Sequence, residues 1–556
     1  MKQLFLAFTV LFILQNGMAQ KTAAPVKTAT TLPRPKLVVG IVVDQMRWDF
    51  LYRYYGRYGN GGFKRLMGEG FSCENTFIPY TPTVTAAGHT CIYTGSVPAI
   101  HGIVGNDWID NATQKKVYCS EDNAVAAVGN DGSESKNGKQ SPRNMLVTTI
   151  GDEIRLATNF RSKVIGVALK DRGSILPAGH KANAAYWYDV TTGNWITSTY
   201  YMNDLPQWAK AFNAKKLVDS FYTNGWNTLY PVATYAQSTA DEEPYESKPF
   251  GDSQTKFPYN LSKYKGKSYQ AIATTPFGNT MTMQMAEAAI DNEQLGKGIE
   301  TDMLCVSFSS TDYVGHAFGP NSLETEDTYL RLDKDLATFF NYLDEKVGKG
   351  QYTVFLSADH GVAHVPGFMK ENNLPGGVVA EGGLSSKEMS SKIKEKFGVS
   401  KAVLGVMNYQ VYLNHNAIDS ANADEKSIGN WIINYLQQND AVQRAFLLKD
   451  LSVTTLNAKM KDMFANGYNP SRSGDIQIVF KPGYIEGHGD GSTGTTHGLW
   501  APYDAHIPLL FYGWGIKQGH TNRETYMTDI AATITALLHV QMPSGCVGKV
   551  VEEAFK

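Results

Sequence analysis

Runs of apolar residues that end at charged or polar residues recur along this 556-residue chain. Six of these runs predict β-strands, at 36–45, 162–172, 301–312, 352–361, 475–484 and 506–515. Their apolar positions are largely continuous, which is typical of strands that are buried on both faces of a parallel sheet. The pattern therefore predicts a central sheet whose strands carry polar residues at their ends.

Amphipathic helices are predicted between these strands. The segment 328–348 places Leu332, Leu336, Phe339, Phe340, Leu343 and Val347 on one stripe, and 527–540 does the same with Ile530, Ile534 and Leu537. Alternating strands and helices predict an α/β protein with a mostly parallel central sheet sandwiched by helices. Two segments break the alternation, at about 178–270 and 365–472, and we interpret both as large insertions that cap the sheet. Within the first, residues 186–201 predict a hairpin.

The N-terminus has the pattern of an export signal. One lysine, Lys2, precedes the apolar run 4–14 and a short stretch of small and polar residues, as in a secretory signal peptide. We predict a signal peptide at 1–19, cleaved after Ala19, and a flexible lead-in at 20–35. The alternative is an uncleaved anchor, but the apolar run is far shorter than the ~20 residues of a membrane-spanning helix. A soluble protein that is periplasmic or secreted is expected.

Composition excludes some classes of function. The formal net charge is −2 and no block of like charges occurs, whereas a sequence-nonspecific nucleic-acid binder needs a basic excess. The five cysteines are an odd number, so at least one is free. A chain of this length can bury enough apolar surface to fold without disulfides.

Acidic residues and histidines gather just past the predicted strands or in Gly/Thr loops. A single Asp after a strand most often caps a helix or a turn, but the joint pattern is harder to obtain by chance. Mixed carboxylate and imidazole ligands suit Zn²⁺. Six ligands divide into two sites of three, and two metal ions form a clamp for in-line phosphoryl displacement. These residues are Asp44, Asp312, His316, Asp359, His360 and His497.

The segment 79–108 has no apolar period and is rich in glycine, threonine and proline. Small residues let a backbone approach another group closely, and the threonines offer hydroxyl groups. This segment can therefore supply the nucleophile that a two-metal site requires.

The motifs together resemble the alkaline phosphatase superfamily. They are "VVD" (42–44), "PTVTAAGHT" (82–90), "HGIVGNDW" (101–108), "STDYVGH" (310–316), "SADHG" (357–361) and "TTHGLW" (495–500). With "LKDR" (169–172) and the signal peptide, the chain is most similar to the periplasmic, monomeric, zinc-dependent, phosphate-irrepressible alkaline phosphatases of flavobacteria. The resemblance runs from about residue 35 to the end, so 36–556 is expected to be one catalytic domain with the two insertions.

The resemblance implies a role for each site residue. One zinc ion is held by Asp312, His316 and His497, and the other by Asp44, Asp359 and His360. Thr85 is implied as the nucleophile and as a further ligand of the second zinc, since metal coordination makes its alkoxide accessible near neutral pH. The neighbouring Thr81, Thr83 and Thr90 are expected to cap turns or to pack, and His89, His101 and His364 to be structural.

Three further residues are expected to bind the phosphoryl group. Asn106 matches an amide donor of the family, the alternative being a turn-forming Asn before Asp107. Lys170 and Arg172 are two apart at a predicted strand end, where extended backbone would turn both side chains to one face; the alternative is a solvated basic edge. The position of Lys170 corresponds to a magnesium site of other family members, so no third ion is expected.

These assignments predict an exported phosphomonoesterase that acts on small-molecule phosphate monoesters through a phosphothreonine intermediate. A phosphodiesterase or nucleotide pyrophosphatase of the same fold is the alternative, because it would share the zinc ligands and Thr85. The Lys170–Arg172 pair favours the monoesterase, since a monoester carries one more anionic oxygen. A sulfatase is discarded because Cys91 lacks the Pro and Arg that its maturation requires. A binding protein without activity is disfavoured by the complete ligand set.

Overall fold

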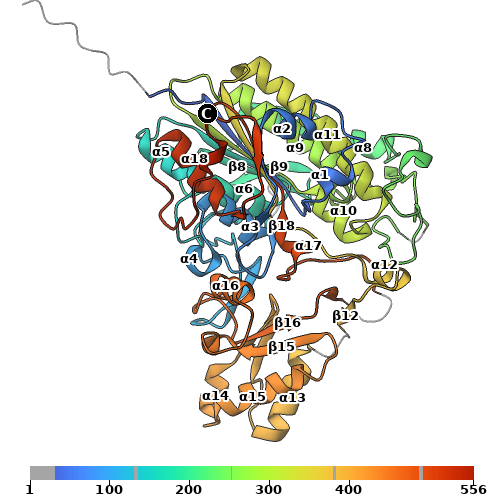
Figure 1. Cartoon of the computed structure of the whole chain (residues 1–556), viewed down its shortest axis with the longest axis vertical. Coiled ribbons are helices and arrows are strands. Elements are labelled where there is room, and N and C mark those ends of the chain that lie inside the picture. Colours follow the sequence, from blue (N-terminus) through green and yellow to red (C-terminus); the bar gives the residue numbers. More distant parts are fainter. Residues whose placement is uncertain (1–31, 131–135, 252, 380–383, 488–491) are drawn as a thin grey trace, which may run out of the picture. The chain divides into compact units, whose positions relative to one another are not determined.

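The fold is organised around a ten-stranded sheet in the order β20-β2-β19-β11-β1-β10-β7-β8-β9-β6 (Figure 1). Its middle strands, from β11 to β8, are parallel to one another. This confirms the predicted mostly parallel α/β sheet. The ten strands are β1 (Leu37–Val43), β2 (Phe71–Cys73), β6 (Ala127–Val128), β7 (Val164–Ala168), β8 (Ala184–Asp189), β9 (Asn194–Ser198), β10 (Asp302–Phe308), β11 (Tyr352–Ser357), β19 (Leu509–Gly513) and β20 (Gly519–Thr521).

The structure is a computed structural model that describes residues 32–130, 136–251, 253–379, 384–487 and 492–556. The signal peptide expected at 1–19 and most of the lead-in at 20–35 lie outside the described residues. The described chain from Pro35 to Lys556 forms one structural unit. Across the described ranges, no helix combines the length and the apolar character needed to cross a membrane. All five cysteines are unpaired.

Helices cover both faces of the sheet (Figure 1). Every residue of β1 and β10 is buried, because helices pack on either side of these strands, and this explains their continuous apolar pattern. One face carries α3 (Thr85–Thr94), α5 (Ile150–Ala157), α6 (Asp171–Ala178) and α18 (Asp529–Leu538), and the other α2 (Phe63–Glu69), α9 (Phe277–Glu293), α10 (Ser310–Phe318) and α11 (Leu323–Leu343).

The two predicted helices form close to their expected bounds. The apolar stripe predicted for 328–348 is buried along α11 and the π-helical turn Asp344–Gly348 that continues it. The stripe predicted for 527–540 is buried on α18. Helical periodicity therefore identified both helices and the faces they bury.

A second, smaller sheet has the order β13-β14-β16-β15 and is antiparallel throughout. It has its own hydrophobic core, formed with α13, α14 and α15, which lie below this sheet in Figure 1. Its elements are β13 (Val403–Met407), β14 (Gln410–Leu413), β15 (Val442–Leu447) and β16 (Ile476–Phe480), with α13 (Ser386–Phe397), α14 (His415–Ser420), α15 (Glu425–Leu436) and α16 (Ala458–Gly467).

Two predicted strands are placed differently from the expectation. The run 475–484 forms β16 of the small sheet instead of a central strand, since apolar clusters bury it on both faces as they would a parallel strand. The run 506–515 contains β19, which is central but antiparallel to β11. An apolar run records burial but not the direction or the sheet of a strand.

The hairpin predicted at 186–201 forms as β8 and β9. Because β8 pairs with β7, this hairpin extends the central sheet instead of capping it. The remaining elements are short. They are α1 (Phe50–Arg53), α4 (Pro98–His101), α7 (Gln207–Ala214), α8 (Leu217–Asn224), α12 (Pro366–Glu371), α17 (Pro502–Ala505), β3 (Thr76–Phe77), β4 (Asp107–Asp110), β5 (Lys115–Tyr118), β12 (Gly377–Val379), β17 (Tyr484–Glu486), β18 (His506–Ile507) and β21 (Thr525–Tyr526).

Candidate active site

The site lies at the carboxyl edge of three neighbouring strands, β11, β1 and β10. Asp44 follows β1, Asp359 and His360 follow β11, and Asp312 lies in the first turn of α10 just after β10. Parallel strands end at the same edge of a sheet, where open α/β folds bind their ligands. The register of these strands thus brings Asp44 together with Asp312 and Asp359, which lie far from it in the chain.

The first group of donor atoms surrounds the Nε2 atom of His360. That atom lies 3.3 Å from Oδ2 of Asp359, 3.6 Å from Oδ1 of Asp44 and 3.4 Å from Oγ1 of Thr85. All four side chains are almost completely buried. The structure therefore brings the predicted triad and the predicted nucleophile around one point.

The second group surrounds Oδ1 of Asp312. The Nε2 atom of His316, one turn further along α10, lies 3.2 Å from this oxygen, and the Nε2 atom of His497 lies 3.6 Å from it. The rings of His497 and His360 are stacked at 3.5 Å between centroids, so the two groups adjoin. The arrangement joins the two predicted triads into one continuous cluster. Within it, ligand atoms of Asp312, His360 and His497 lie within 4.8 Å of one another, and so do those of Asp44, His89 and Asp359, so that His360 is within reach of both groups.

The three histidines are all held in the same tautomer by backbone carbonyls. Nδ1 of His316 contacts the carbonyl oxygen of Thr495 at 2.8 Å, Nδ1 of His360 that of Gly361 at 3.0 Å, and Nδ1 of His497 that of Thr83 at 2.7 Å. A carbonyl oxygen only accepts hydrogen bonds, so each Nδ1 carries the proton. In the neutral imidazole each Nε2 atom then has its lone pair directed into the site, as a metal ligand requires.

Two buried carboxylate oxygens in the first group accept no well-formed hydrogen bond, namely Oδ1 of Asp44 and Oδ2 of Asp359, although Nδ1 of His89 lies 3.2 Å from the second. Burial raises the pKa of Asp44 well above its ordinary value, and the charge of Asp359 adds to this shift. Burial acts in the same sense on Asp359, but the neighbouring His360 and His89 outweigh it and lower its pKa. Unpartnered buried carboxylate oxygens are costly, and these two face the lone pair of His360.

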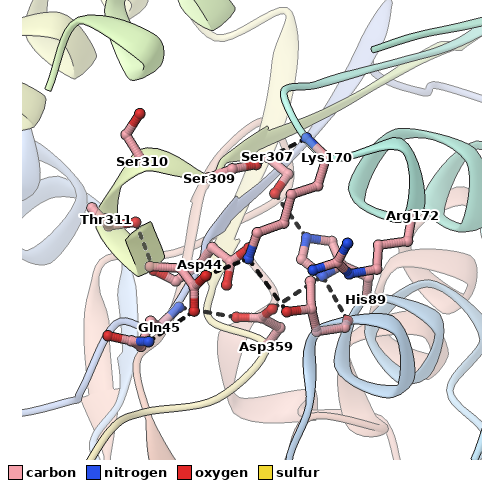
Figure 2. A network of polar contacts seen from close by, with 12 residues as sticks. Asp44, Gln45, His89, Lys170, Arg172, Ser307, Ser309, Ser310, Thr311 and Asp359 are labelled. Carbon is pink, nitrogen blue, oxygen red and sulfur yellow. Dashed lines mark hydrogen bonds and ion pairs between the residues drawn. The ribbon is translucent and has the colours of Figure 1, made fainter. Parts of the chain in front are cut away.

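The amine of Lys170 bridges the two groups (Figure 2). Its Nζ donates to Oδ2 of Asp44 at 2.7 Å and to Oδ2 of Asp312 at 2.6 Å, and it lies 3.4 Å from Oγ1 of Thr85. Burial favours the neutral amine, but the Asp312 and Asp44 carboxylates outweigh it and raise the pKa of Lys170. A fixed positive charge therefore stands beside the predicted nucleophile.

Arg172 lies in the first turn of α6. Lys170 is the N-cap of this helix. The sequence suggested an extended backbone for this pair, whereas the strand β7 ends at Ala168 and the pair begins a helix. Nη1 of Arg172 donates to the hydroxyl of Tyr118 at 3.2 Å, and that hydroxyl donates to Asp171 at 2.6 Å. Nε of Arg172 is buried without a partner, so this cation retains an unused donor.

Asn106 lies just before β4 and is partly buried. Its side-chain carbonyl accepts a hydrogen bond from the backbone amide of Ala86 at 3.0 Å. Ala86 follows Thr85 in α3, so Asn106 is tied to the start of the helix that carries the predicted nucleophile. This orientation commits its oxygen to the backbone and leaves its amide nitrogen as a donor.

Thr85 is the first residue of α3, and that helix packs tightly on the strand end that carries Asp359. A Cβ atom on Gly88 would lie 2.4 Å from the carbonyl oxygen of Asp359, so glycine is required for this approach. His89, one turn further, contacts the carbonyl oxygen of Thr85 at 2.9 Å, Oδ2 of Asp359 at 3.2 Å and Oγ of Ser307 at 2.8 Å (Figure 2). Because its Nδ1 faces two acceptors, that nitrogen carries a proton and His89 positions its neighbours.

Gln45 is a site residue that the sequence reasoning did not find. Its Nε2 donates to Oδ1 of Asp312 at 2.8 Å, and its backbone amide donates to Oδ1 of Asp359 at 3.1 Å. It has a positive φ of 67°, which non-glycine residues seldom adopt. A Cβ on Gly315 would lie 1.8 Å from Oε1 of Gln45. Neither the conformation nor this contact leaves a signal in a single sequence.

The other histidines near the motifs are placed apart from the two triads. His364 is held between Asn321, at 2.6 Å from Nδ1, and Arg47, at 3.2 Å from Nε2. Burial lowers the pKa of His364 to about 4, followed in effect by the charges of Arg47 and Arg53. The Nδ1 atom of His101 accepts from the amide of Ile103 at 3.1 Å.

Comparison with known proteins places this chain in a family. Residues 38–500 match the model of the type I phosphodiesterase / nucleotide pyrophosphatase family. The chain belongs to this family, within the alkaline phosphatase superfamily. The match spans both insertions and five of the six strands predicted from the sequence.

Several relatives are similar over nearly their whole length. Alkaline phosphatase PhoV of Synechococcus elongatus is 52% identical, with 100% of both chains covered. A protein of Myroides odoratus named calcium-transporting ATPase is 52% identical, with 94% of this chain and 95% of that protein covered. Alkaline phosphatase PafA of Elizabethkingia meningoseptica is 51% identical, with 97% of both covered. The crystal structure of wild-type PafA superposes with a TM-score of 0.91 over 95% of this chain and 100% of that one.

Proposed function

We propose that this protein is an alkaline phosphatase, a zinc-dependent hydrolase of phosphate monoesters that works through a covalent phosphothreonine and releases inorganic phosphate. The observation that carries the proposal is the position of the Thr85 hydroxyl. It lies 3.4 Å both from Nε2 of His360 and from Nζ of Lys170. A hydroxyl fixed between a metal-ligand lone pair and a cation is placed to be ionised and to attack.

The donor set fits two zinc ions. Three Nε2 atoms point inward, and two buried carboxylate oxygens, on Asp44 and Asp359, accept no well-formed hydrogen bond. Zn²⁺ prefers this mixture of imidazole and carboxylate. We assign Asp312, His316 and His497 to one ion and Asp44, Asp359, His360 and Thr85 to the other. When bound, the ions supply Lewis-acid charge that favours ionised oxygens on both sides of the phosphorus.

The chain's own residues account for the sequence of steps. Oγ1 of Thr85 attacks phosphorus and loses its proton, the bond from phosphorus to the ester oxygen breaks, and that oxygen takes up one proton so that the alcohol is released. Water then attacks the phosphothreonine, and the bond from phosphorus to Oγ breaks, which returns the threonine and releases phosphate. His89 holds the Thr85 carbonyl and fixes the start of α3, so the hydroxyl keeps its position throughout.

Charge on the transferred phosphoryl group is stabilised by three side chains in this scheme. Lys170 supplies a buried positive charge, Arg172 an unused guanidinium donor and Asn106 an amide donor. Tyr118 holds Arg172 through its hydroxyl, which limits the reorganisation that the cation must undergo. Preorganised donors of this kind commonly contribute the largest single part of a rate enhancement.

A phosphodiesterase or nucleotide pyrophosphatase is the second candidate, and the matched family description favours it. It would use the same two triads and the same Thr85. Arg172 and Lys170 favour the monoesterase, because a diester has an organic group where a monoester has an anionic oxygen. Purified enzyme should be assayed on a monoester and a diester that share one leaving group. A kcat/KM that is higher for the diester would overturn the proposal.

Export is a separate part of the proposal. The signal pattern at 1–19 supports delivery of a monomeric, soluble enzyme to the periplasm or the exterior, where it would act on small phosphate esters without a nucleic-acid or membrane partner. Intact-mass measurement of the protein recovered from its native host should show a chain that begins at Gln20. A mass that retains residues 1–19 would contradict this assignment.

A further inference from the structure

A pair of buried glutamates outside the active site has no partner for most of its oxygens. Glu246 lies in the loop before α9 and is 4% exposed, and Glu324 lies in the first turn of α11 and is fully buried. Both carboxylate oxygens of Glu246, and Oε2 of Glu324, accept no hydrogen bond from the described part of the chain. Only Oε1 of Glu324 is engaged, by the hydroxyl of Tyr259 at 2.6 Å.

The other acids of the same helical turn are paired with cations. Glu326 forms an ion pair with Arg57 at 3.0 Å, and Asp327 forms one with Arg331 at 2.7 Å. Glu324 lies on the same turn and is buried as completely as these two residues. Burying an unpaired carboxylate is costly. Arginines thus neutralise the neighbouring acids, whereas Glu246 and Glu324 have no such partner among the described residues.

The charges that act most on the pair are all negative. Burial, and after it the carboxylates of Glu324, Glu243 and Asp241, raises the pKa of Glu246 to about 10. Burial also raises the pKa of Glu324 to about 8, with Asp241 and Asp327 adding to it. The loop thus gathers several acidic groups near the pair, and within the described residues neither Glu246 nor Glu324 forms an ion pair with a basic side chain.

Protons or a metal ion could relieve this arrangement, and the surrounding charge favours the ion. A proton on each acid would neutralise the pair, but it would leave the charges of Asp241 and Glu243 in place. A divalent cation can bind all three unpartnered oxygens and also offsets the surrounding charge.

We infer that Glu246 and Glu324 bind a Ca²⁺ ion at a structural site distinct from the zinc cluster. The donors are oxygens alone, which selects a hard cation over zinc. One acid comes from an irregular loop and one from a helix, which suits the adaptable coordination of Ca²⁺ better than the near-ideal octahedral coordination that Mg²⁺ demands. Backbone carbonyls of the loop and water complete the coordination.

The site fastens a loop that touches the second triad. The amide of Ser247, next to Glu246, donates to the carbonyl oxygen of Ala317 at 2.8 Å, one residue past His316. The carbonyl oxygen of Tyr245 accepts from the amide of Gly494 at 2.9 Å, in the segment that leads to His497. Calcium therefore stabilises the segment that braces the active site without contacting the reacting atoms.

The test uses the full-length, zinc-loaded enzyme, dialysed into calcium-free buffer and compared with and without millimolar CaCl₂. Metal analysis, Tm and Tb³⁺ luminescence are measured on the wild type and on Glu246→Gln and Glu324→Gln. Tyr259 contacts Glu324, and its ring lies 5.5 Å from that of Trp226, so both can sensitise bound Tb³⁺. Glu242→Gln is the matched control, because Glu242 is exposed in the same loop and already pairs with Lys256 at 2.7 Å.

We expect about one calcium per wild-type chain and a rise in Tm of about 2–4 °C on adding calcium. Glu242→Gln should respond in the same way, whereas both glutamine variants of the pair should lose the calcium, the Tm response and the Tb³⁺ signal while keeping their zinc. A wild-type Tm that does not respond to calcium, or that responds only to Mg²⁺, overturns the inference. So does an unchanged response in Glu246→Gln.

Discussion

The two sheets of this protein differ in whether the charged residues beside them are buried and paired. At the carboxyl edge of β11, β1 and β10, carboxylates and imidazoles are buried together, and one oxygen each of Asp44 and Asp359 accepts no well-formed hydrogen bond. Beside the small sheet, His415 has a carboxylate on each ring nitrogen, Glu425 at 2.9 Å and Asp475 at 3.0 Å, and it remains partly exposed. The first arrangement is costly unless a ligand completes it, whereas the second is already satisfied. The central edge is therefore expected to determine activity and the small sheet to contribute stability.

The largest expected effect is on the nucleophile. Thr85→Ala should lower kcat/KM by about 10⁴-fold or more, because no other hydroxyl occupies its position. Thr83→Ala is the matched control, since Thr83 is equally buried but donates to the carbonyl oxygen of Leu499 at 3.0 Å, and it should keep most activity. Thr85→Ser should retain much of it. Steady-state kinetics and acid-quenched phosphate labelling measure the outcome, and label found on any residue but Thr85 would refute the assignment.

Loss of a metal ion should cause the second-largest fall in activity. His497→Ala should cost at least about 100-fold in kcat and lower the zinc content, because its Nε2 lone pair is removed from the second triad. Dialysis against a chelator should abolish wild-type activity, and added zinc should restore it. His415→Ala, at the small sheet, should leave both the zinc content and kcat unchanged. Fewer than two zinc ions in fully active enzyme would contradict the two-site assignment.

The next effect separates the two candidate functions. Lys170→Ala combined with Arg172→Ala should lower monoester kcat/KM by about two to four decades, since each charge-assisted contact is worth about 1.5–3 kcal/mol. Diester hydrolysis should fall far less. Equal losses on both substrates would mean that the two cations hold the site together without distinguishing the esters. Tyr118→Phe should give a smaller loss on the monoester, because it removes only the group that holds Arg172.

A smaller change in kcat is expected when a buried glutamine is replaced, and one glutamine from each region allows the comparison. Gln45→Ala should lower kcat by about 10- to 100-fold and weaken zinc binding, since Gln45 donates to Asp312 and lies against Asp359. Gln410→Ala should reduce stability and leave kcat unchanged, because Gln410 donates only to Gln477, at 3.1 Å, within the small sheet. Zinc titrations and urea unfolding distinguish the two. If both variants lost only stability, Gln45 would have no role in positioning the ligands.

The smallest effect is a pH dependence confined to the small sheet. Hydrogen bonding to Asp475 is the largest cause that raises the pKa of His415 to about 9, against an ordinary value of 6.5. Because the pKa of His415 is raised in the folded protein, the protonated histidine stabilises the folded state fully below pH 6.5. This contribution is lost as the pH rises through 9. The histidine is 37% exposed, so we expect only about 0.5–1 kcal/mol. Urea midpoints of wild type and His415→Ala should differ at pH 6 and converge at pH 10.

The amino-acid sequence predicted the kind of fold, which the structure confirms, and it predicted a set of candidate site residues that the fold brings together. Continuous apolar runs record burial on both faces, and the helical period records the buried stripe of α11, so these features were readable locally. Acidic residues and histidines at run ends, together with the motifs around Thr85, marked the residues that the fold later gathers. Local pattern suffices for such features because each depends on the burial or chemistry of a single segment.

Only the tertiary structure decided which strand lies in which sheet, and how the site is supported. The run that forms β16 is buried in the small sheet and β19 runs antiparallel, since burial carries no information about direction or neighbours. The positive φ of Gln45, the helical start at Lys170 and the unpartnered Glu246 and Glu324 depend on contacts between segments far apart in the chain. Pairing, register and charge compensation are properties of several segments at once, and so they appear only when the chain is folded.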